Sequence, residues 1–498
     1  MTTSQRRIPV WLAVVAASLP MFMATLDNLV ITNALPAMRA ELGASIEELQ
    51  WYVNAFTLAF ATFILAAAAL GDRIGRRSVF LAGILVFTAA SALVALSTES
   101  WMVIASRAVQ GVGAAGIMPL SLTLLAGAVP PRLRPAAIGI WGGVAGLGVA
   151  LGPLIGGAVV EGWNWQAIFW LNVPIGIVAI PLAILALPNT LGARLRIDLP
   201  GVALAGLGVL AVVFGIVRGN DAGWDSLEVV GSLIAGAVLL GAFLLWERRA
   251  SAPLLPLRLF RDRSFSAANV VGFAFSFGMF GAVFLLIQFL QVVQGASALE
   301  AGVQTMPWTL APMLVAPLAG FVAPRVGTRA LIAAGLALQT AALVWIAAVM
   351  SPDVAYSVLV APFLLAGVGM GLVFAPMSTA VLANMGEHDH AKASATNSTL
   401  REVGVALGVA VLTAVFTGAG GELTPAGYVD AAVPAVLTGA AALAIALIAA
   451  LFLPAGRATV SGPTIATAAA PRSATAPADE ASGEASGRPV DREPAAVA

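Results

Sequence analysis

The sequence predicts an all-α integral membrane protein with fourteen membrane-spanning helices. Three observations carry this prediction: the composition, the recurring apolar runs and the placement of the arginines. Hydrophobic residues make up 60% of the 498 residues and charged residues 10%, whereas soluble proteins carry about 25% charged residues. A chain with so little polar surface does not stay dispersed in water. The even spread of its apolar runs favours one polytopic membrane domain over several soluble domains.

Apolar runs of roughly 18–25 residues recur along the chain, separated by short clusters of Arg, Gly or Pro. About 20 helical residues cross the hydrocarbon core of a bilayer, and a helix satisfies its own backbone groups where lipid cannot. The predicted spans are 10–32, 49–70, 78–97, 101–128, 136–160, 166–187, 199–218, 228–246, 266–291, 301–323, 330–350, 354–380, 394–418 and 432–453.

The first span could be mistaken for a signal peptide, because Arg6 and Arg7 precede it. Its apolar stretch, 10–32, is longer than the 7–15 residues usual for a signal core. It is therefore interpreted as a retained transmembrane helix.

The positive charges alternate between the two sides of the predicted membrane, as the positive-inside rule requires. One side holds only Arg39 and Arg218 and is otherwise acidic. Omitting or adding one span would destroy this alternation, so both termini are expected in the cytoplasm of a cell-membrane protein. The arginine-rich side holds Arg6, Arg7, Arg73, Arg76, Arg77, Arg132, Arg134, Arg194, Arg196, Arg248, Arg249, Arg258, Arg261, Arg263, Arg325, Arg329, Lys392 and Arg457.

A weak internal repeat suggests how the spans are organised. The segment 320–329, after the tenth span, is similar to 68–77, after the second. Two sets of six helices around a two-helix insert would give these loops equivalent positions, a pattern typical of transporters; independent short Arg/Gly loops are the alternative. The predicted domains are a cytoplasmic N-terminus (1–9), an N-terminal six-helix bundle (10–187), the insert with its linkers (188–265), a C-terminal six-helix bundle (266–453) and a tail (454–498).

The tail is rich in Ala, Pro, Ser, Thr, Glu and Gly and has no apolar period, so it is expected to be a disordered cytoplasmic segment. A solvated tail is favoured over a regulatory one.

Several classes of chemistry are excluded. The chain has no cysteine, so it has neither disulfides nor a thiolate metal site. Its single lysine, Lys392, stands between two alanines and does not match the Gly-Lys-Ser/Thr of a nucleotide-binding loop. The chain is predicted to be no enzyme, and no cofactor, metal, nucleotide or nucleic-acid partner is expected.

Asp27 is the most informative residue, because it lies within or near the end of the first span. A carboxylate at the centre of a membrane helix costs about 2.5–3.5 kcal/mol on insertion scales. Burial disfavours its charged form, so Asp27 is predicted to bind and release a proton. The alternative is an acid at the outer interface, since Pro36 follows nine residues later.

Arg107 is the second charge within a span, in the fourth. Arginine does not lose its proton in proteins, so it needs an acid, carbonyl groups or water. It is predicted to influence when a nearby acid releases its proton; a structural arginine bonded to a helix end is the alternative.

The loop between the second and third spans reads Gly71-Asp72-Arg73-Ile74-Gly75-Arg76-Arg77. Glycine allows a tight turn, and Asp72 with the arginines can pair with other helices or their ends. The loop is predicted to make contacts that differ between transporter states. A plain positive-inside anchor explains the arginines, but not Asp72 or the glycines.

The fifth span carries small residues that allow close helix packing, together with Pro153, which bends a helix. Its motif consists of Gly148, Gly152, Pro153, Gly156 and Gly157. Taken alone, this pattern indicates ordinary packing.

Other signals are weaker. Phe273, Phe277 and Phe280 of the ninth span, with Asn28 and Gln110, are candidates for a substrate cavity, although core or lipid packing explains the phenylalanines equally well. Arg401 and Glu402 are candidates for a gate contact. His388 and His390 flank Asp389 in a cytoplasmic loop, where a solvated loop is favoured over a metal site.

Together these motifs resemble the major facilitator superfamily, and most closely its fourteen-helix drug:proton antiporter branch of the QacA/EmrB type. The resemblance covers about 10–453. Asp27 matches the acidic motif of that branch's first helix, and the loop from Gly71 to Arg77 matches the superfamily's loop signature. Arg107, Gln110 and Gly111 match the fourth-helix motif, which the resemblance links to proton coupling.

The fifth-helix motif, from Gly148 to Gly157, is similar to the antiporter motif, the most function-specific element. The segments 165–176 and 256–265 look like the signatures that open the sixth helix and precede the ninth. The sequence departs from the family pattern at Ala68, Asn28 and Pro324, which puts in doubt the packing of the loop, the environment of Asp27 and the symmetry of gating.

The resemblance implies a proton-coupled antiporter that exports amphipathic small molecules such as drugs, dyes or antibiotics by alternating access. Its expected partners are the substrate, protons and the lipid bilayer, and it is expected to act as a monomer. The alternatives are a proton-coupled uptake permease for a metabolite, which the fifth-helix motif disfavours, and a membrane receptor that moves no ligand.

Overall fold

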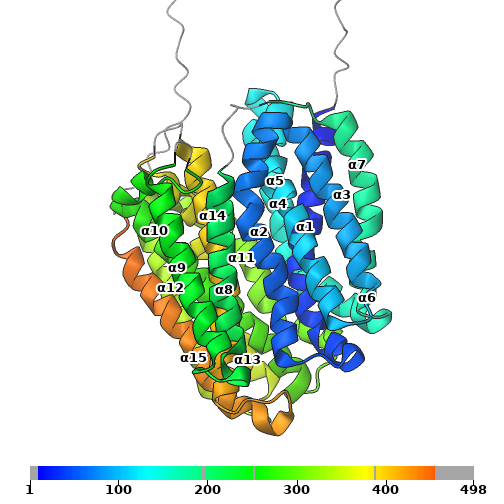
Figure 1. Cartoon of the computed structure of the whole chain (residues 1–498), viewed down its shortest axis with the longest axis vertical. Coiled ribbons are helices and arrows are strands. Elements are labelled where there is room, and N and C mark those ends of the chain that lie inside the picture. The colour runs from blue at the N-terminus through cyan, green and yellow to red at the C-terminus, as the bar shows by residue number, and fades with distance from the viewer. Residues whose placement is uncertain (1–8, 192–197, 251–252, 386–388, 455–498) are drawn as a thin grey trace, which may run out of the picture. The chain divides into compact units, whose positions relative to one another are not determined.

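The computed structural model describes residues 9–191, 198–250, 253–385 and 389–454. Within these ranges fourteen helices are long and apolar enough to cross a membrane, which confirms the predicted number of spans (Figure 1). The predicted N-terminal segment up to residue 8 and the tail from residue 455 lie outside the described residues, as do Arg6, Arg7, Arg194, Arg196 and Arg457.

The chain forms the helix pattern of a major-facilitator fold, with six spans, an insert of two and six more. The first six spans are α1 (Val10–Leu42), α2 (Ile46–Ile74), α3 (Arg76–Ala95), α4 (Ser100–Ala128), α5 (Arg134–Gly162) and the consecutive pair α6 (Gln166–Trp170) and α7 (Asn172–Ala186). The insert is α8 (Leu199–Ala222) and α9 (Leu227–Glu247). The last six are α10 (Arg263–Gln288, continued by a π turn, Phe289–Val293), α11 (Ala298–Val326), α12 (Thr328–Val349), α13 (Tyr356–Leu382), α14 (His390–Gly418) and α15 (Pro425–Ala450).

Helix α1 is ten residues longer than predicted. It runs to Leu42 through Pro20 and Pro36, and it ends at Gly43, which adopts a left-handed φ of 66°. The predicted end at residue 32 was wrong because it followed the loss of apolar residues, whereas the helix itself stops only where glycine permits a left-handed residue. Asp27 therefore lies in the middle of this helix, not near its end.

The similarity between 68–77 and 320–329 has a structural counterpart. Gly75 is both the C-cap of α2 and the N-cap of α3, with φ 116° and ψ 122°. Gly327 has the same role between α11 and α12, with φ 94° and ψ 142°. Such positive φ angles favour glycine. The two loops therefore have a glycine of similar backbone conformation at equivalent places in the two halves.

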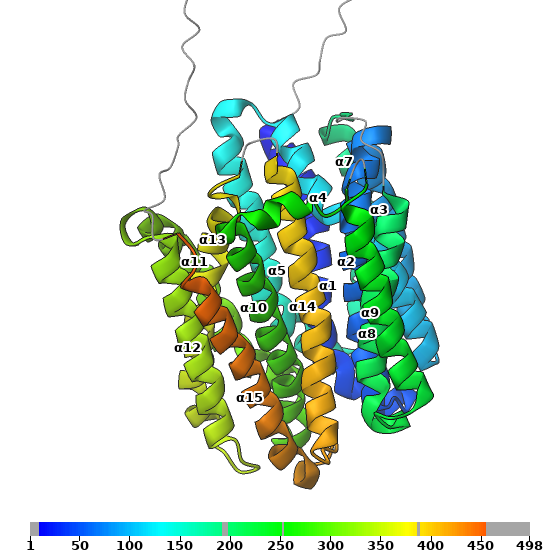
Figure 2. The same cartoon turned by 60° about the vertical axis from the view of Figure 1, so that its left-hand side comes forward.

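The insert packs against both halves of the molecule (Figures 1 and 2, green). Val213 and Val217 of α8 form an apolar cluster with Leu58 of α2 and with Ala406 and Ala410 of α14. At the same end of α8, Arg218 Nη1 donates to Glu47 Oε2 of α2 at 3.0 Å. Asn220 Nδ2 donates to the Ala414 carbonyl of α14 at 2.6 Å. The insert is thus attached to one helix of each half.

The N-terminal and C-terminal halves approach each other closely at the C-terminal end of α5, where this helix contacts α11. The glycines near the N-terminal end of α5 have no such neighbour. A Cβ on Gly157 would lie less than 3 Å from backbone atoms of Ala298 and Leu299 in α11, which shows how near the two helices are. A Cβ on Gly139 or Gly142, near the start of α5, would meet no atom within 4 Å. The described contacts between α5 and α11 run from Gly157 through Pro153 to Ala150, whose carbonyl accepts a hydrogen bond from Thr309 Oγ1 at 3.2 Å.

Candidate functional site

Asp27 lies at the centre of a buried polar network between α1, α4 and α7. Its side chain is 2% exposed. One carboxylate oxygen forms an ion pair with Arg107 Nη1. The other accepts hydrogen bonds from Gln110 Nε2 at 2.9 Å and Asn172 Nδ2 at 2.8 Å. The charged carboxylate is compensated on both oxygens, which is the condition under which a protein tolerates a buried charge.

Arg107 is fully buried and is held on several sides. Its Nε donates to the Tyr52 carbonyl of α2 at 3.1 Å, and Nη1 also donates to Gln110 Oε1 at 2.8 Å. The guanidinium lies 4.4 Å from the centre of the Phe56 ring, a cation–π arrangement. Its Nη2 has no hydrogen-bond partner among the described residues. Arg107 thus forms an ion pair with a residue 80 positions earlier in the sequence, and its Nη2 remains as a donor without an acceptor among the described residues.

Asn172 and Ser91 extend the network to α7 and α3. Asn172 is 1% exposed, and its Nδ2 also lies 3.0 Å from Ser91 Oγ, which itself donates to the Phe169 carbonyl. The sequence reasoning contained Asn172 only as part of the sixth-helix signature and assigned it no contact with Asp27. The signal that could have identified it is an amide side chain at the start of an otherwise apolar span.

The glycines of α5 bring that helix against the segment of α1 that carries Asp27. A Cβ on Gly148 would lie 3.3 Å from the Leu26 nitrogen, and one on Gly152 2.9 Å from Leu29 Cβ. Gly156 faces Val30 in the same way. These spacings leave no room for side chains on this face, so α1 and α5 are expected to move together.

The same stretch of α5 reaches the other half of the molecule. The Pro153 carbonyl accepts a hydrogen bond from Asn33 Nδ2 of α1 at 2.5 Å, and it lies against Gly302 of α11. Gly157 touches α11 one turn later. The α5 motif therefore connects the helix of Asp27 to the C-terminal half.

The loop from Gly71 to Arg77 is fixed to the end of α7. Arg76 Nε pairs with Asp72 Oδ1 at 2.7 Å. Arg77 Nη1 donates to the carbonyls of Ile184 and Leu187, both at 3.0 Å, where the unpaired carbonyls of a helix end attract a cation. Gly71 packs on Leu120 of α4, and Arg73 is exposed. The loop thus binds α2, α3, α4 and α7 together at one end of the N-terminal half.

A narrow apolar cavity lies between the two halves. Its volume of about 30 Å³ is close to that of one water molecule, whereas small-molecule sites usually measure about 300–1,000 Å³. A drug-sized molecule would enter only after the halves separate. The cavity is lined by Leu29, Thr32, Val149, Pro153, Met279, Phe280, Val283, Leu286, Ile287, Thr305, Trp308, Thr309, Phe363 and Met370.

The candidate cavity residues are only partly brought together. Phe280 lines the cavity, but Phe273 and Phe277 do not; their backbone lies against Gly404 and Gly408 of α14. Gln110 belongs to the Asp27 network instead. Asn28 is half-buried and makes no hydrogen bond with the described residues. Of the three phenylalanines, only Phe280 is therefore placed where a substrate cavity was expected.

The remaining candidates lie apart from this site. The guanidinium of Arg401 stacks 4.7 Å from the ring centre of Phe374 in α13, and the predicted gate role of Arg401 and Glu402 stays a prediction. His388 lies outside the described residues.

Comparison with known proteins agrees with this architecture. The family model of the Major Facilitator Superfamily matches residues 17–409 and 268–489. The chain is 32% identical to the tetracenomycin C resistance and export protein of Streptomyces glaucescens, over 86% of this chain and 79% of that protein. It is 38% identical to the cephamycin export protein CmcT of Amycolatopsis lactamdurans, over 83% and 86%. It is 33% identical to a methylenomycin A resistance protein of Bacillus subtilis, over 90% and 95%.

Among solved structures, a mutant of the nucleoside transporter NupG superposes with a TM-score of 0.63 at 11% identity. The superposition covers 89% of this chain and 99% of that one, and it supports the fold alone. With the family model, the export proteins and the fourteen helices in agreement, the chain belongs to the Major Facilitator Superfamily of multi-pass membrane proteins.

Proposed function

We propose that the protein is a proton-coupled antiporter that exports amphipathic small molecules by alternating access. The observation that carries the proposal is the buried network of Asp27, Arg107, Gln110 and Asn172, packed against an α5 helix that reaches the other half of the molecule. The relatives named as export and resistance proteins support the direction of transport.

Proton uptake at Asp27 would remove the negative charge that now compensates Arg107. The ion pair would weaken, and the acceptor that Asn172 and Gln110 share would change its charge. Because α1 and α5 pack without intervening side chains, a shift of α1 relative to α4 and α7 would move α5 and change its contact with α11. Protonation of Asp27 would thus be coupled to the separation of the two halves at the contact between α5 and α11.

The orientation follows from the charges. The ends of the helices that carry the arginine-rich loops are assigned to the cytoplasm, together with both termini. The closely packed end of α5 and α11 is then the outer end, so the conformation described is closed to the outside. We also propose that a single chain is the transporting unit.

Dye accumulation in inverted membrane vesicles tests the proposal, because these vesicles expose the cytoplasmic face. The wild type is expected to load dye when a proton gradient is present. Asp27→Asn keeps the size of the side chain but removes the proton-binding group, and it should reduce gradient-driven loading at least tenfold.

Asp225→Asn, which changes an exposed carboxylate in the turn between α8 and α9, is the matched control and should load dye like the wild type. Full gradient-driven export by Asp27→Asn would remove this residue from the coupling step. Uptake into right-side-out vesicles would favour the permease instead.

A further inference from the structure

Trp308 of α11 presents the one polar hydrogen of the cavity wall that has no protein acceptor among the described residues. The side chain is 4% exposed, and its Nε1 is buried without a hydrogen-bond partner in the described part of the chain. An unpaired buried N–H costs free energy, because it has given up its bond to water and gained none in return. A donor in this state is poised to bind an acceptor that enters the cavity.

The other polar groups of the wall are already used. Thr32 Oγ1 donates to the Leu29 carbonyl at 2.7 Å, and Thr305 Oγ1 donates to the Gly302 carbonyl at 2.9 Å. Thr309 Oγ1 donates across to the Ala150 carbonyl of α5 at 3.2 Å. Their hydrogens therefore point at the backbone, which leaves Trp308 as the free donor of the wall.

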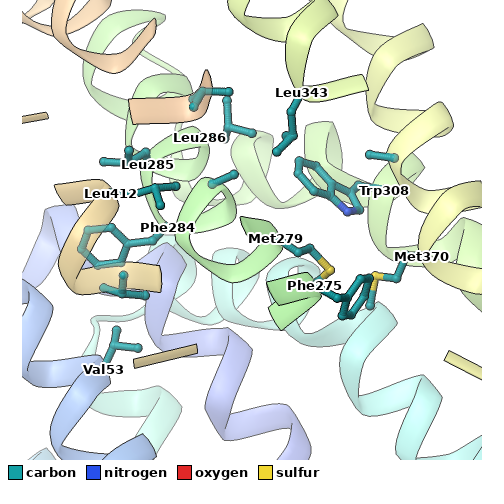
Figure 3. Packing of buried hydrophobic residues seen from close by; sticks show 14 of the residues in the cluster. Val53, Phe275, Met279, Phe284, Leu285, Leu286, Trp308, Leu343, Met370 and Leu412 are labelled. Atoms are coloured by element: carbon teal, nitrogen blue, oxygen red, sulfur yellow. The ribbon is translucent and has the colours of Figure 1, made fainter. Parts of the chain in front are cut away.

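The geometry directs this donor into the cavity. In Figure 3 the nitrogen edge of the Trp308 indole is turned toward the side on which Met279 and Met370 lie, away from Leu343. Met279 and Met370 both line the cavity, and Leu343 does not. The Phe363 ring lies 5.8 Å from the indole at 47°. The donor is thus surrounded by aromatic and thioether groups, which suit a flat, polarisable molecule.

The wall carries no charge. None of its fourteen lining residues is ionisable, and Asp27 is turned away into its own network with Arg107. A permanently cationic molecule in this cavity would be desolvated without a countercharge, which is strongly unfavourable. An uncharged molecule with a carbonyl oxygen would lose little on entry and would satisfy Trp308.

We infer that Trp308 Nε1 is a specificity-determining donor that selects uncharged aromatic substrates bearing a carbonyl oxygen. The inference rests on the proposed function only in placing the substrate between the two halves, and it narrows the class of compound expected there. The donor acts by binding, so its effect belongs to affinity and not to proton coupling.

Binding to the full-length protein in lipid nanodiscs tests the inference independently of any proton gradient. The three probes are anthraquinone, anthracene, which keeps the rings without the carbonyls, and an anthraquinone that carries a quaternary ammonium group. Empty nanodiscs correct for partition into lipid. The wild type should bind anthraquinone about tenfold more tightly than anthracene, as one hydrogen bond allows. It should also bind anthraquinone at least about tenfold more tightly than the cationic probe, whose charge would lose its water without gaining a countercharge.

Trp308→Phe keeps one aromatic ring and removes the donor together with the five-membered ring of the indole, so anthracene, which has no acceptor, reports the effect of the lost ring area alone. The substitution should weaken anthraquinone binding about tenfold and leave anthracene binding within twofold. Trp345→Phe makes the same change at a residue on α12 that is 44% exposed and lies outside the cavity wall; it is the matched control and should change neither. Thermal unfolding of each variant identifies any loss of the folded state.

The outcomes separate the two proposals. Equal binding of anthraquinone by the wild type and Trp308→Phe, or tighter binding of the cationic probe by the wild type, would overturn the inference whether or not the protein exports dyes. Selective loss of anthraquinone binding in Trp308→Phe would support it, even if the vesicle experiment showed no proton-driven export and the proposed function failed.

Discussion

The N-terminal and C-terminal halves share a backbone plan but not its chemistry. Gly75 and Gly327 link equivalent helix pairs with similar positive φ angles. Glycines of α5 pack on α1, and Gly404 and Gly408 of α14 pack on α10. The close helix contacts therefore depend on small residues at repeated positions in both halves.

The halves differ in what they bury. The N-terminal half contains the hydrogen-bonded ion pair of Asp27 and Arg107. The C-terminal half carries Arg401 and Glu402 inside α14, but they form no ion pair among the described residues, and Glu402 Oε2 is buried without a hydrogen-bond partner there. Its helix contacts instead include bonds between neutral groups, such as Asn397 Nδ2 to Asn269 Oδ1 at 3.3 Å. Most of the cavity wall belongs to α10, α11 and α13. We infer a division of labour in which the first half binds the proton and the second half supplies most of the substrate surface.

The largest expected effect tests the difference between charged and neutral networks. Arg107→Ala would leave Asp27 buried without its countercharge, and breaking a buried ion pair in this way costs about 3–5 kcal/mol. Thermal unfolding in detergent should show a large loss of stability. Asn397→Ala removes a neutral contact in the other half and should cost about 1 kcal/mol.

The double variant Asp27→Asn with Arg107→Ala should recover part of the stability, because it no longer contains a lone buried charge. Equal losses for Arg107→Ala and Asn397→Ala would mean that the two halves do not differ energetically as the contacts indicate.

A second effect, of intermediate size, tests the contact through which the halves communicate. Gly157→Val would place methyl groups against the α11 backbone at Ala298 and Leu299, so the closed outer end should no longer form. Gradient-driven dye loading should fall about tenfold, with less change in stability than for Arg107→Ala.

Gly139→Val makes the same change on the same helix at a position where a Cβ meets no atom within 4 Å. Its transport should stay within twofold of the wild type. If both valine variants transported normally, the approach of α5 to α11 would have no part in the cycle.

The smallest effect concerns the two loops. Asp72 at the end of α2 pairs with Arg76 at the start of α3, with both side chains 27% exposed, and such a partly exposed ion pair contributes about 0.2–1 kcal/mol. The corresponding loop of the second half has Pro324 and Thr328 in these places. Asp72→Asn should therefore lower the free energy of unfolding by less than about 1 kcal/mol.

A much larger loss of stability in Asp72→Asn would show that Asp72 supports the first loop in a way that the second loop has no need of. A transport rate that falls while stability is kept would instead assign Asp72 to the moving contacts predicted for this loop. Urea or thermal unfolding together with dye loading distinguishes these results.

The sequence by itself determined the number of helices and the superfamily, because lipid forces each apolar run of sufficient length into a helix. It also singled out Asp27 and Arg107, since an ionisable residue within a membrane span is costly and rarely without a role. Glycine patterns correctly indicated where helices approach closely. These signals are local, and each can be found without knowing which helix lies beside which.

Only the tertiary structure decided which groups meet. It joined Asp27 to Arg107 and Asn172, placed Phe280 but not Phe273 or Phe277 in the cavity wall, and left Trp308 with a free donor there. In a soluble protein the apolar face of a helix indicates its buried side. Here lipid and the protein interior are equally apolar, so the pattern along a helix does not tell which of its sides contacts another helix and which contacts the membrane.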